Sequence, residues 1–259
     1  MADTRANWLR KLNSARLWEK IARQRYIWNP TPENRAKLKR RREQVAYAER
    51  VLKRHPASKP VAAHGFDVSN NNGRVDFKAA EKSGEDFVWI KAGEGDWKDP
   101  TFMANVKAAT AAGLHAGAYQ FLRPKPGRTG AQEAAFFISQ LEAAGLGKGD
   151  LMPVADVEAT KLDKAGTREY VRSFVNALKA HGFRPLIYTG DWFWRPNIGV
   201  DEDFGCPLWL AGYVPENQLV IPKPWKHWTV CQYDDKGHVP GVTGGVDVNK
   251  TPDLRKVIA

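Results

Sequence analysis

The first sixty residues carry apolar side chains at spacings of three and four, which is the period of an α-helix. They form two series: Trp8, Leu12, Ala15, Trp18, Ala22 and Tyr26, then Leu38, Val45, Ala48 and Leu52. The segment "WNPTP" separates the two series, and Thr31 followed by Pro32 is a typical helix start. We therefore predict an antiparallel helical hairpin over residues 1–55, followed by a proline-containing linker over 56–63.

Beyond residue 64 the pattern changes to short apolar runs that are typical of strands. The runs are "GFDVS", "FVWIKAG", "HAGAYQFL", "MPVADVE", "PLIYTG", "PLWLAGY", "HWTVCQYD" and "GVDVNK". Helical spacing fits residues 101–112, 130–144 and 165–181 between them. Strands that alternate with helices indicate a parallel sheet, and eight strands in about 195 residues predict a partly degenerate β/α barrel. The predicted fold class is α/β, with a barrel over 64–259 whose helices lie mainly in its first half.

Charge is divided unevenly between these two regions. Residues 1–60 contain 17 Lys and Arg against 5 Asp and Glu, a net charge of +12, whereas residues 61–259 contain 23 against 24. The barrel is therefore nearly neutral, and nucleic acid is an improbable partner for it. We expect the basic hairpin to contact an anionic cell-wall polymer or a membrane. The wall polymer is favoured over membrane disruption or an oligomerisation hairpin, because Trp8, Trp18 and Trp28 are ten residues apart and do not form one apolar stripe.

The cysteine content and the N-terminal sequence lead to expectations about the compartment. Cys206 and Cys231 are too few for a disulfide scaffold and lack the spacing of a zinc site. The first twenty residues have no apolar core like that of a signal peptide. We expect the protein to be made in a host cytoplasm. It would act on the cell wall after a separate protein has permeabilised the membrane.

Carboxylates recur at the predicted strand ends. Asp156 and Glu158 are two residues apart at the end of one strand, so they share a face with Cα atoms about 6.5 to 7 Å apart. Like charges this close raise the pKa of one group, which provides a proton donor near neutral pH. Asp67 ends the first strand, and Asp247 lies in the last strand, which neighbours the first when the barrel closes. An acidic turn explains each residue alone, but together they predict four acids at the barrel mouth.

The ordered motifs resemble the family 25 glycoside hydrolases, the N-acetylmuramidases of phages and bacteria. The resemblance spans about residues 64 to 250 and rests on "GFDVSNNNGRVDF", "FVWIKAGEG", "PVADVE", "RPLIYTG", "PLWLAGY" and "CQYDDKGHVPGVTGGVDVN". It implies hydrolysis of the β-1,4 bond between N-acetylmuramic acid and N-acetylglucosamine in peptidoglycan. By this resemblance Glu158 is the general acid/base and Asp156 its partner, either as a nucleophile or as a stabiliser of the substrate's acetamido group. Asp67 and Asp247 are the supporting carboxylates.

Other side chains near the strand ends are candidates for binding the sugar. Flat aromatic faces can meet the C–H faces of pyranose rings, although core packing is the alternative for each of these residues. We predict substrate contacts from Tyr119, Tyr188, Trp209, Tyr213, the amide of Gln232, and Glu94 as a fifth acid. No cofactor and no metal is expected, because the acids lack histidine partners.

The resemblance and the basic hairpin together suggest a phage endolysin. A virion-associated lysin or a bacterial autolysin with the same chemistry is the alternative. A catalytically silent glycan-binding domain would be expected to lose its acid, and Glu158 is present. A chitinase of the related barrel type would contain a D-x-x-D-x-D-x-E signature, which this sequence does not have. The basic segment "KLKRRREQ" suggests a nucleic-acid-binding protein as a further alternative.

Overall fold

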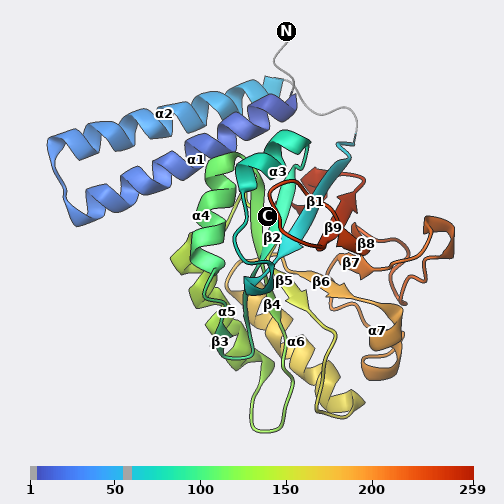
Figure 1. Cartoon of the computed structure of the whole chain (residues 1–259). Coiled ribbons are helices and arrows are strands. Elements are labelled where there is room, and N and C mark those ends of the chain that lie inside the picture. The colour runs from blue at the N-terminus through green and yellow to red at the C-terminus, as the bar shows by residue number, and fades with distance from the viewer. Residues whose placement is uncertain (1–4, 55–59) are drawn as a thin grey trace.

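The computed structural model describes residues 5–54 and 60–259. A helical hairpin, α1 (Arg5–Trp28) and α2 (Pro32–Arg54), lies against one end of a β/α barrel (Figure 1). The hairpin and the barrel were both predicted. The predicted linker over 56–63 falls largely outside the described residues.

Eight strands close the barrel. In chain order they are β1 (Ala63–Val68), β2 (Phe87–Glu94), β4 (His115–Phe121), β5 (Val154–Asp156), β6 (Leu186–Thr189), β7 (Leu208–Ala211), β8 (Val230–Gly237) and β9 (Val246–Thr251). The barrel closes because β1 pairs with both β2 and β9. The two-residue strand β3 (Trp97–Lys98) pairs only with the end of β2.

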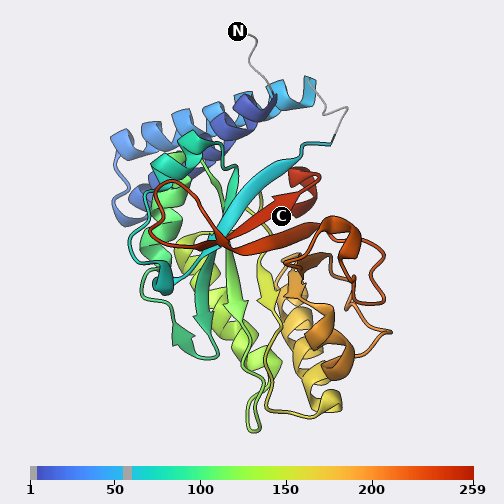
Figure 2. The same ribbon diagram turned by 45° about the vertical axis from the view of Figure 1, so that its right-hand side comes forward.

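The last strand departs from the predicted parallel sheet. Strands β1 to β8 of the barrel pair in parallel, whereas β9 is antiparallel to both β8 and β1 (Figure 2). The start of β9 therefore lies where the other strands end. The register places Asp247, the second residue of β9, opposite Asp67.

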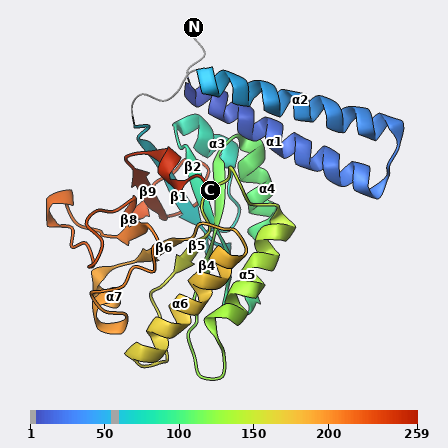
Figure 3. The same ribbon diagram turned by 180° about the vertical axis from the view of Figure 1, so that it is seen from behind.

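Helices cover the outside of the first half of the barrel (Figure 3). They are α3 (Phe77–Ser83), α4 (Phe102–Ala112), α5 (Gly130–Ala144) and α6 (Lys164–Ala180), with α7 (Asp191–Asn197) after β6. Their apolar faces pack on outward-facing strand residues such as Val88 and Ile90. The predictions at 101–112, 130–144 and 165–181 are confirmed, while α3 and α7 were not predicted.

The barrel interior holds a layer of aromatic rings below the mouth. Trp89 and Trp209 lie with ring centroids 4.6 Å apart, and Trp89 Nε1 donates to the Met152 carbonyl at 3.0 Å. Gly117 leaves the space for Trp89, because a Cβ there would lie 2.7 Å from Nε1 of that indole. This packed aromatic layer supports the polar side chains at the mouth.

The hairpin is attached where the strands begin. Asn13 Nδ2 lies 2.7 Å from Nδ1 of His115, the first residue of β4, and Arg10 pairs with Glu81 at the end of α3. Its own apolar core is small, with Leu12 buried against Ala48. Among the described residues, no helix combines the length and the hydropathy needed to cross a bilayer.

Candidate active site

Inward-facing side chains at the ends of the strands form a polar layer over the two tryptophans. The period of two along each strand brings Asp67, Asp156 and Asp247 into the barrel, and Glu158 is the second residue after the end of β5. Burial raises the pKa values of Asp67, Asp156 and Asp247, and the charge of Glu158 adds to each of these shifts. The four predicted acids therefore meet at one mouth and act on one another.

Asp67 is fixed by a chain of hydrogen bonds from the barrel interior. Its Oδ2 accepts from Gln232 Nε2 and from Asn249 Nδ2, both at 2.8 Å. Trp209 Nε1 donates to Asn249 Oδ1, also at 2.8 Å, and so fixes the orientation of that amide. Burial, followed by the charge of Asp247, raises the pKa of Asp67 well above its usual range despite these two donors.

Asp156 offers a buried oxygen to a ligand. The residue is 6% exposed, and among the described residues its Oδ1 has no hydrogen-bond partner. Burial, then the charges of Glu158 and Asp67, raise its pKa well above the usual value, while Lys91 and Arg123 oppose this shift. A buried polar atom left without a partner is costly, which is expected where a substrate completes the bonding.

Glu158 and Asp247 are the more accessible pair of acids. Burial raises the pKa of Glu158, against the opposing charges of Arg123 and Lys91. Burial also raises the pKa of Asp247 to about 6, with help from Asp235 and Glu158. A half-buried carboxyl with a raised pKa keeps its proton to a higher pH than a free carboxyl does, and it can donate that proton to a leaving group.

Two cations at the mouth were not predicted. Lys91 Nζ contacts Glu94 Oε2 at 2.6 Å, and the Arg123 guanidinium contacts Glu94 Oε1 at 2.8 Å. Burial alone would raise the pKa of Glu94, but these hydrogen bonds outweigh it and lower that pKa. Glu94 is thus an ion-paired residue rather than a proton donor. The sequence did carry a signal for Lys91, since it interrupts the apolar run "FVWIKAG".

The predicted sugar-binding residues differ in how exposed their side chains are. Tyr213 is 48% exposed and Tyr119 is half-buried, so both can meet a ligand. Tyr188 is only 8% exposed, and its hydroxyl, like that of Tyr213, donates to Gln232 Oε1. Gln232 is thereby engaged with two tyrosines and Asp67. Trp209 is 2% exposed and cannot stack on a sugar as predicted; it supports Asn249 instead.

The mouth suits acid–base chemistry on a polar substrate. It combines half-buried carboxyl groups with raised pKa values, a buried carboxyl group whose Oδ1 has no hydrogen-bond partner among the described residues, and partly exposed tyrosine rings. Within residues 5–54 and 60–259, no three His, Cys, Asp or Glu side chains are grouped to hold a metal ion.

Comparison with known proteins defines the class. Residues 66–242 match the family description "Glycosyl hydrolases family 25". The chain belongs to this family and is a glycoside hydrolase.

Particular relatives extend the match. Lysozyme M1 of Streptomyces globisporus is 32% identical over 197 residues, which cover 72% of this chain and 66% of that protein. A family GH25 lysozyme structure from Aspergillus fumigatus is 34% identical, with a TM-score of 0.66 over 77% of this chain and all of that one. The CTP1L endolysin structure is 27% identical, with a TM-score of 0.60 over 72% of this chain and 65% of that one.

Proposed function

We propose that this chain is an N-acetylmuramidase that hydrolyses the β-1,4 bond between N-acetylmuramic acid and N-acetylglucosamine in bacterial peptidoglycan. The observation that carries the proposal is the group of four charge-coupled carboxylates at the mouth. The lysozymes among its relatives support the choice of substrate.

Glu158 serves as the general acid and then as the general base. Its raised pKa keeps a proton available for the glycosidic oxygen, and its partial exposure lets a sugar reach it. Once the leaving group has departed, the ionised Glu158 takes a proton from a water molecule whose oxygen bonds to the anomeric carbon. The oxygen of Asp156 or of the 2-acetamido group that held this carbon is displaced, and the sugar is released. The charges of Arg123 and Lys91 oppose the rise of the pKa of Glu158 and so favour the ionised form that this second step needs.

Asp156 faces the positive charge that develops at the anomeric carbon. Its unpartnered Oδ1 is available either to that carbon or to the nitrogen of the substrate's 2-acetamido group. Asp67 and Asp247 are supporting carboxylates, and Asp67 is oriented by Gln232 and Asn249. Tyr119 and Tyr213 provide faces for the sugar rings.

The test is mass analysis of fragments from purified peptidoglycan. We expect products with reducing N-acetylmuramic acid ends from the wild-type protein and none from Glu158→Gln. The matched control is Glu142→Gln, the same change at a surface residue of α5 that pairs with His181; it should leave the products unaltered. Reducing N-acetylglucosamine ends, or free peptide stems, would contradict the proposal.

For the biological setting we propose an endolysin that is made in a host cytoplasm and reaches the wall once a separate protein has permeabilised the membrane. The likeness to the CTP1L endolysin supports this role. A bacterial autolysin is the second candidate, because Lysozyme M1 comes from a bacterium. If the chain is an endolysin, cells expressing it should lyse only after a permeabilising agent is added. Lysis without that agent would contradict this setting.

A further inference from the structure

The hairpin lies at the end of the barrel opposite the active-site mouth. Its α1 helix contacts His115 where β4 begins, and Lys20 is attracted to Asp150, which precedes β5. Burial, then the charge of Arg10, lowers the pKa of His115 to about 4, so the ring is neutral and can accept the Asn13 amide hydrogen. The mouth is formed where these same strands end.

The distal part of the hairpin is a concentrated patch of positive charge. Residues 23–46, called here the hairpin tip, contain eight Lys and Arg against two Glu, a net charge of +6. Lys37 pairs with Glu33, and Arg42 pairs with Glu19. Among the described side chains, five exposed cations of the tip have no ion-pair partner: Arg23, Arg25, Arg35, Lys39 and Arg40. Unpaired exposed charges of one sign attract a polyanionic surface.

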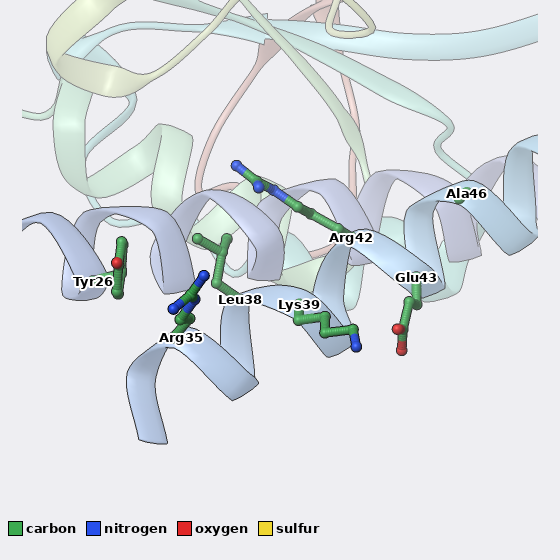
Figure 4. A pocket seen from close by; sticks show the side chains of 7 residues that line it. All are labelled: Tyr26, Arg35, Leu38, Lys39, Arg42, Glu43 and Ala46. Carbon is green, nitrogen blue, oxygen red and sulfur yellow. The ribbon is translucent and has the colours of Figure 1, made fainter. Parts of the chain in front are cut away.

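An open groove of about 670 Å³ runs between the two helices at the tip (Figure 4). Leu38 and Ala46 contribute apolar atoms, and three cations and one acid line the groove from α2: Arg35, Lys39, Arg42 and Glu43. These three cations follow one another at spacings of four and three, so they project from one face of the helix. Such a row can contact several phosphate groups at once.

Apolar side chains stand beside these cations. Ile27 and Trp28, at the end of α1, are 66% and 88% exposed, and Tyr26 next to them lines the groove. Tryptophan and tyrosine gather where a bilayer meets water, because their rings are apolar and their N–H or O–H groups remain hydrated. Exposed aliphatic and aromatic groups next to cations are typical of segments that lie in this interface.

We propose that the hairpin tip binds the surface of a bilayer that contains anionic phospholipids. A wall polymer or a nucleic-acid duplex would satisfy the cations but would offer no aliphatic phase to Ile27 and Trp28. The bilayer satisfies both: phosphate groups meet the row of cations, and the apolar residues enter the headgroup boundary. The sequence alone favoured a wall polymer as the binding partner of the hairpin. We now favour the membrane, because the structure shows where the exposed apolar residues lie.

The position of the hairpin relative to the mouth suggests how membrane binding would help the enzyme. This step rests on the proposed muramidase function. The hairpin packs at the end of the barrel opposite the mouth, and its tip extends sideways past α4, so a membrane bound by the tip leaves the mouth uncovered for peptidoglycan (Figure 1). Binding at the mouth end would instead cover the site.

The test is co-sedimentation of the full chain with vesicles of phosphatidylcholine alone or mixed equally with phosphatidylglycerol. We expect binding mainly to the mixed vesicles, with most of it lost in about 0.5 M salt. Arg35→Gln/Lys39→Gln should weaken it by about 30-fold, given the usual contribution of each basic residue near an anionic surface. Trp28→Ala should weaken it by about tenfold. The matched control, Arg184→Gln/Lys226→Gln, removes the same charge from exposed barrel positions and should change binding by less than about threefold.

Three results would overturn the proposal. The first is equal vesicle binding by the wild-type protein and the Arg35/Lys39 variant. The second is unchanged binding by Trp28→Ala, which would mean that only charge is recognised. The third is binding to isolated walls or duplex DNA without binding to vesicles, which would assign the tip to those polymers. Vesicles contain no glycan, so the Glu158→Gln protein should bind them normally, and failure of either proposal leaves the other standing.

Discussion

The barrel mouth and the hairpin tip both concentrate charge, but they do so in opposite ways. The mouth brings together acids that are far apart in the chain, from Asp67 to Asp247, and withdraws two of them from water fully and two in part. The tip takes its cations from one continuous segment, and five of them are exposed with no ion pair to any residue that the structure describes. In the mouth, Lys91 and Arg123 both contact Glu94.

The difference shows how surroundings decide what a charge can do. Carboxyl groups withdrawn from water have shifted pKa values, and a shifted pKa allows a side chain to transfer a proton near neutral pH. Cations in water keep their ordinary charge and act through attraction that salt screens. The mouth is therefore suited to chemistry and the tip to binding a surface.

The largest expected effect follows from removing the proton donor at the mouth. Glu158→Gln keeps the shape of the side chain but cannot deliver a proton, so we expect clearing of cell-wall suspensions to slow by about 100-fold or more. Thermal unfolding and vesicle binding should stay close to wild type. If the variant clears walls at more than about a tenth of the wild-type rate, another residue is the acid.

The next effect tests whether the two regions are energetically separate. Leu12→Ala removes most of a buried side chain from the small hairpin core, so we expect the hairpin to lose about 2 to 3 kcal/mol of stability. Hydrogen exchange should show faster exchange in α1 and α2 and unchanged exchange in the strands. Parallel loss of protection in the barrel would show that the two regions unfold as one unit.

A smaller effect is expected on the free energy of unfolding when an ionised carboxylate is removed from the mouth. The pKa of Asp247 is raised to about 6, so its ionised form destabilises the folded protein above that pH. Asp247→Asn should therefore increase the free energy of unfolding at pH 8 by about 1 kcal/mol, a value reduced for the partial exposure of the group. The gain should shrink as the pH falls through about 6 and vanish below about pH 3, where the carboxyl is protonated in both the folded and the unfolded state.

The control for this experiment has the opposite sign. The guanidinium of Arg168 lowers the pKa of Asp201 on the surface, so its ionised form is stabilising. Asp201→Asn should lower stability at pH 8 and have no effect at low pH. Denaturant unfolding at the two pH values measures both variants, and a loss of stability in Asp247→Asn at pH 8 would contradict the raised pKa.

No effect at all is expected from removing divalent metals. A proton donor and a stabilising carboxylate suffice for glycoside hydrolysis. Activity on cell walls should be the same in excess EDTA as without it. Loss of activity that one specific divalent ion restores would refute this expectation.

Much of the fold could be predicted because the strands and the long helices have clear periods. The antiparallel direction of β9 could not, since period-two alternation is the same in either direction. The helices α3 and α7 have seven residues each, too few for a helical period to emerge. Pro196 inside α7 further conceals that helix.

The acids of the site were predictable because carboxylates at the ends of apolar strands are conspicuous. Their supports were not, because they depend on how the strands are staggered. Trp209 lies one layer below the mouth in the barrel, so it orients Asn249 rather than contacting a sugar. Asn249 itself follows Asp247 by two residues, the same spacing that identified Asp156 and Glu158, and that signal could have found it.

The most direct test of the coupled mouth is a carboxyl-carbon NMR titration of Asp247 in the full chain. Because the charge of Glu158 contributes to the raised pKa of Asp247, Glu158→Gln should lower that pKa from about 6 toward its ordinary value. Burial and the charge of Asp235 remain, so the shift should be partial, and the Glu142→Gln control should leave the titration unchanged. An identical titration of Asp247 in the wild-type and Glu158→Gln proteins would contradict the account, because the acids would then not act as one electrostatic unit.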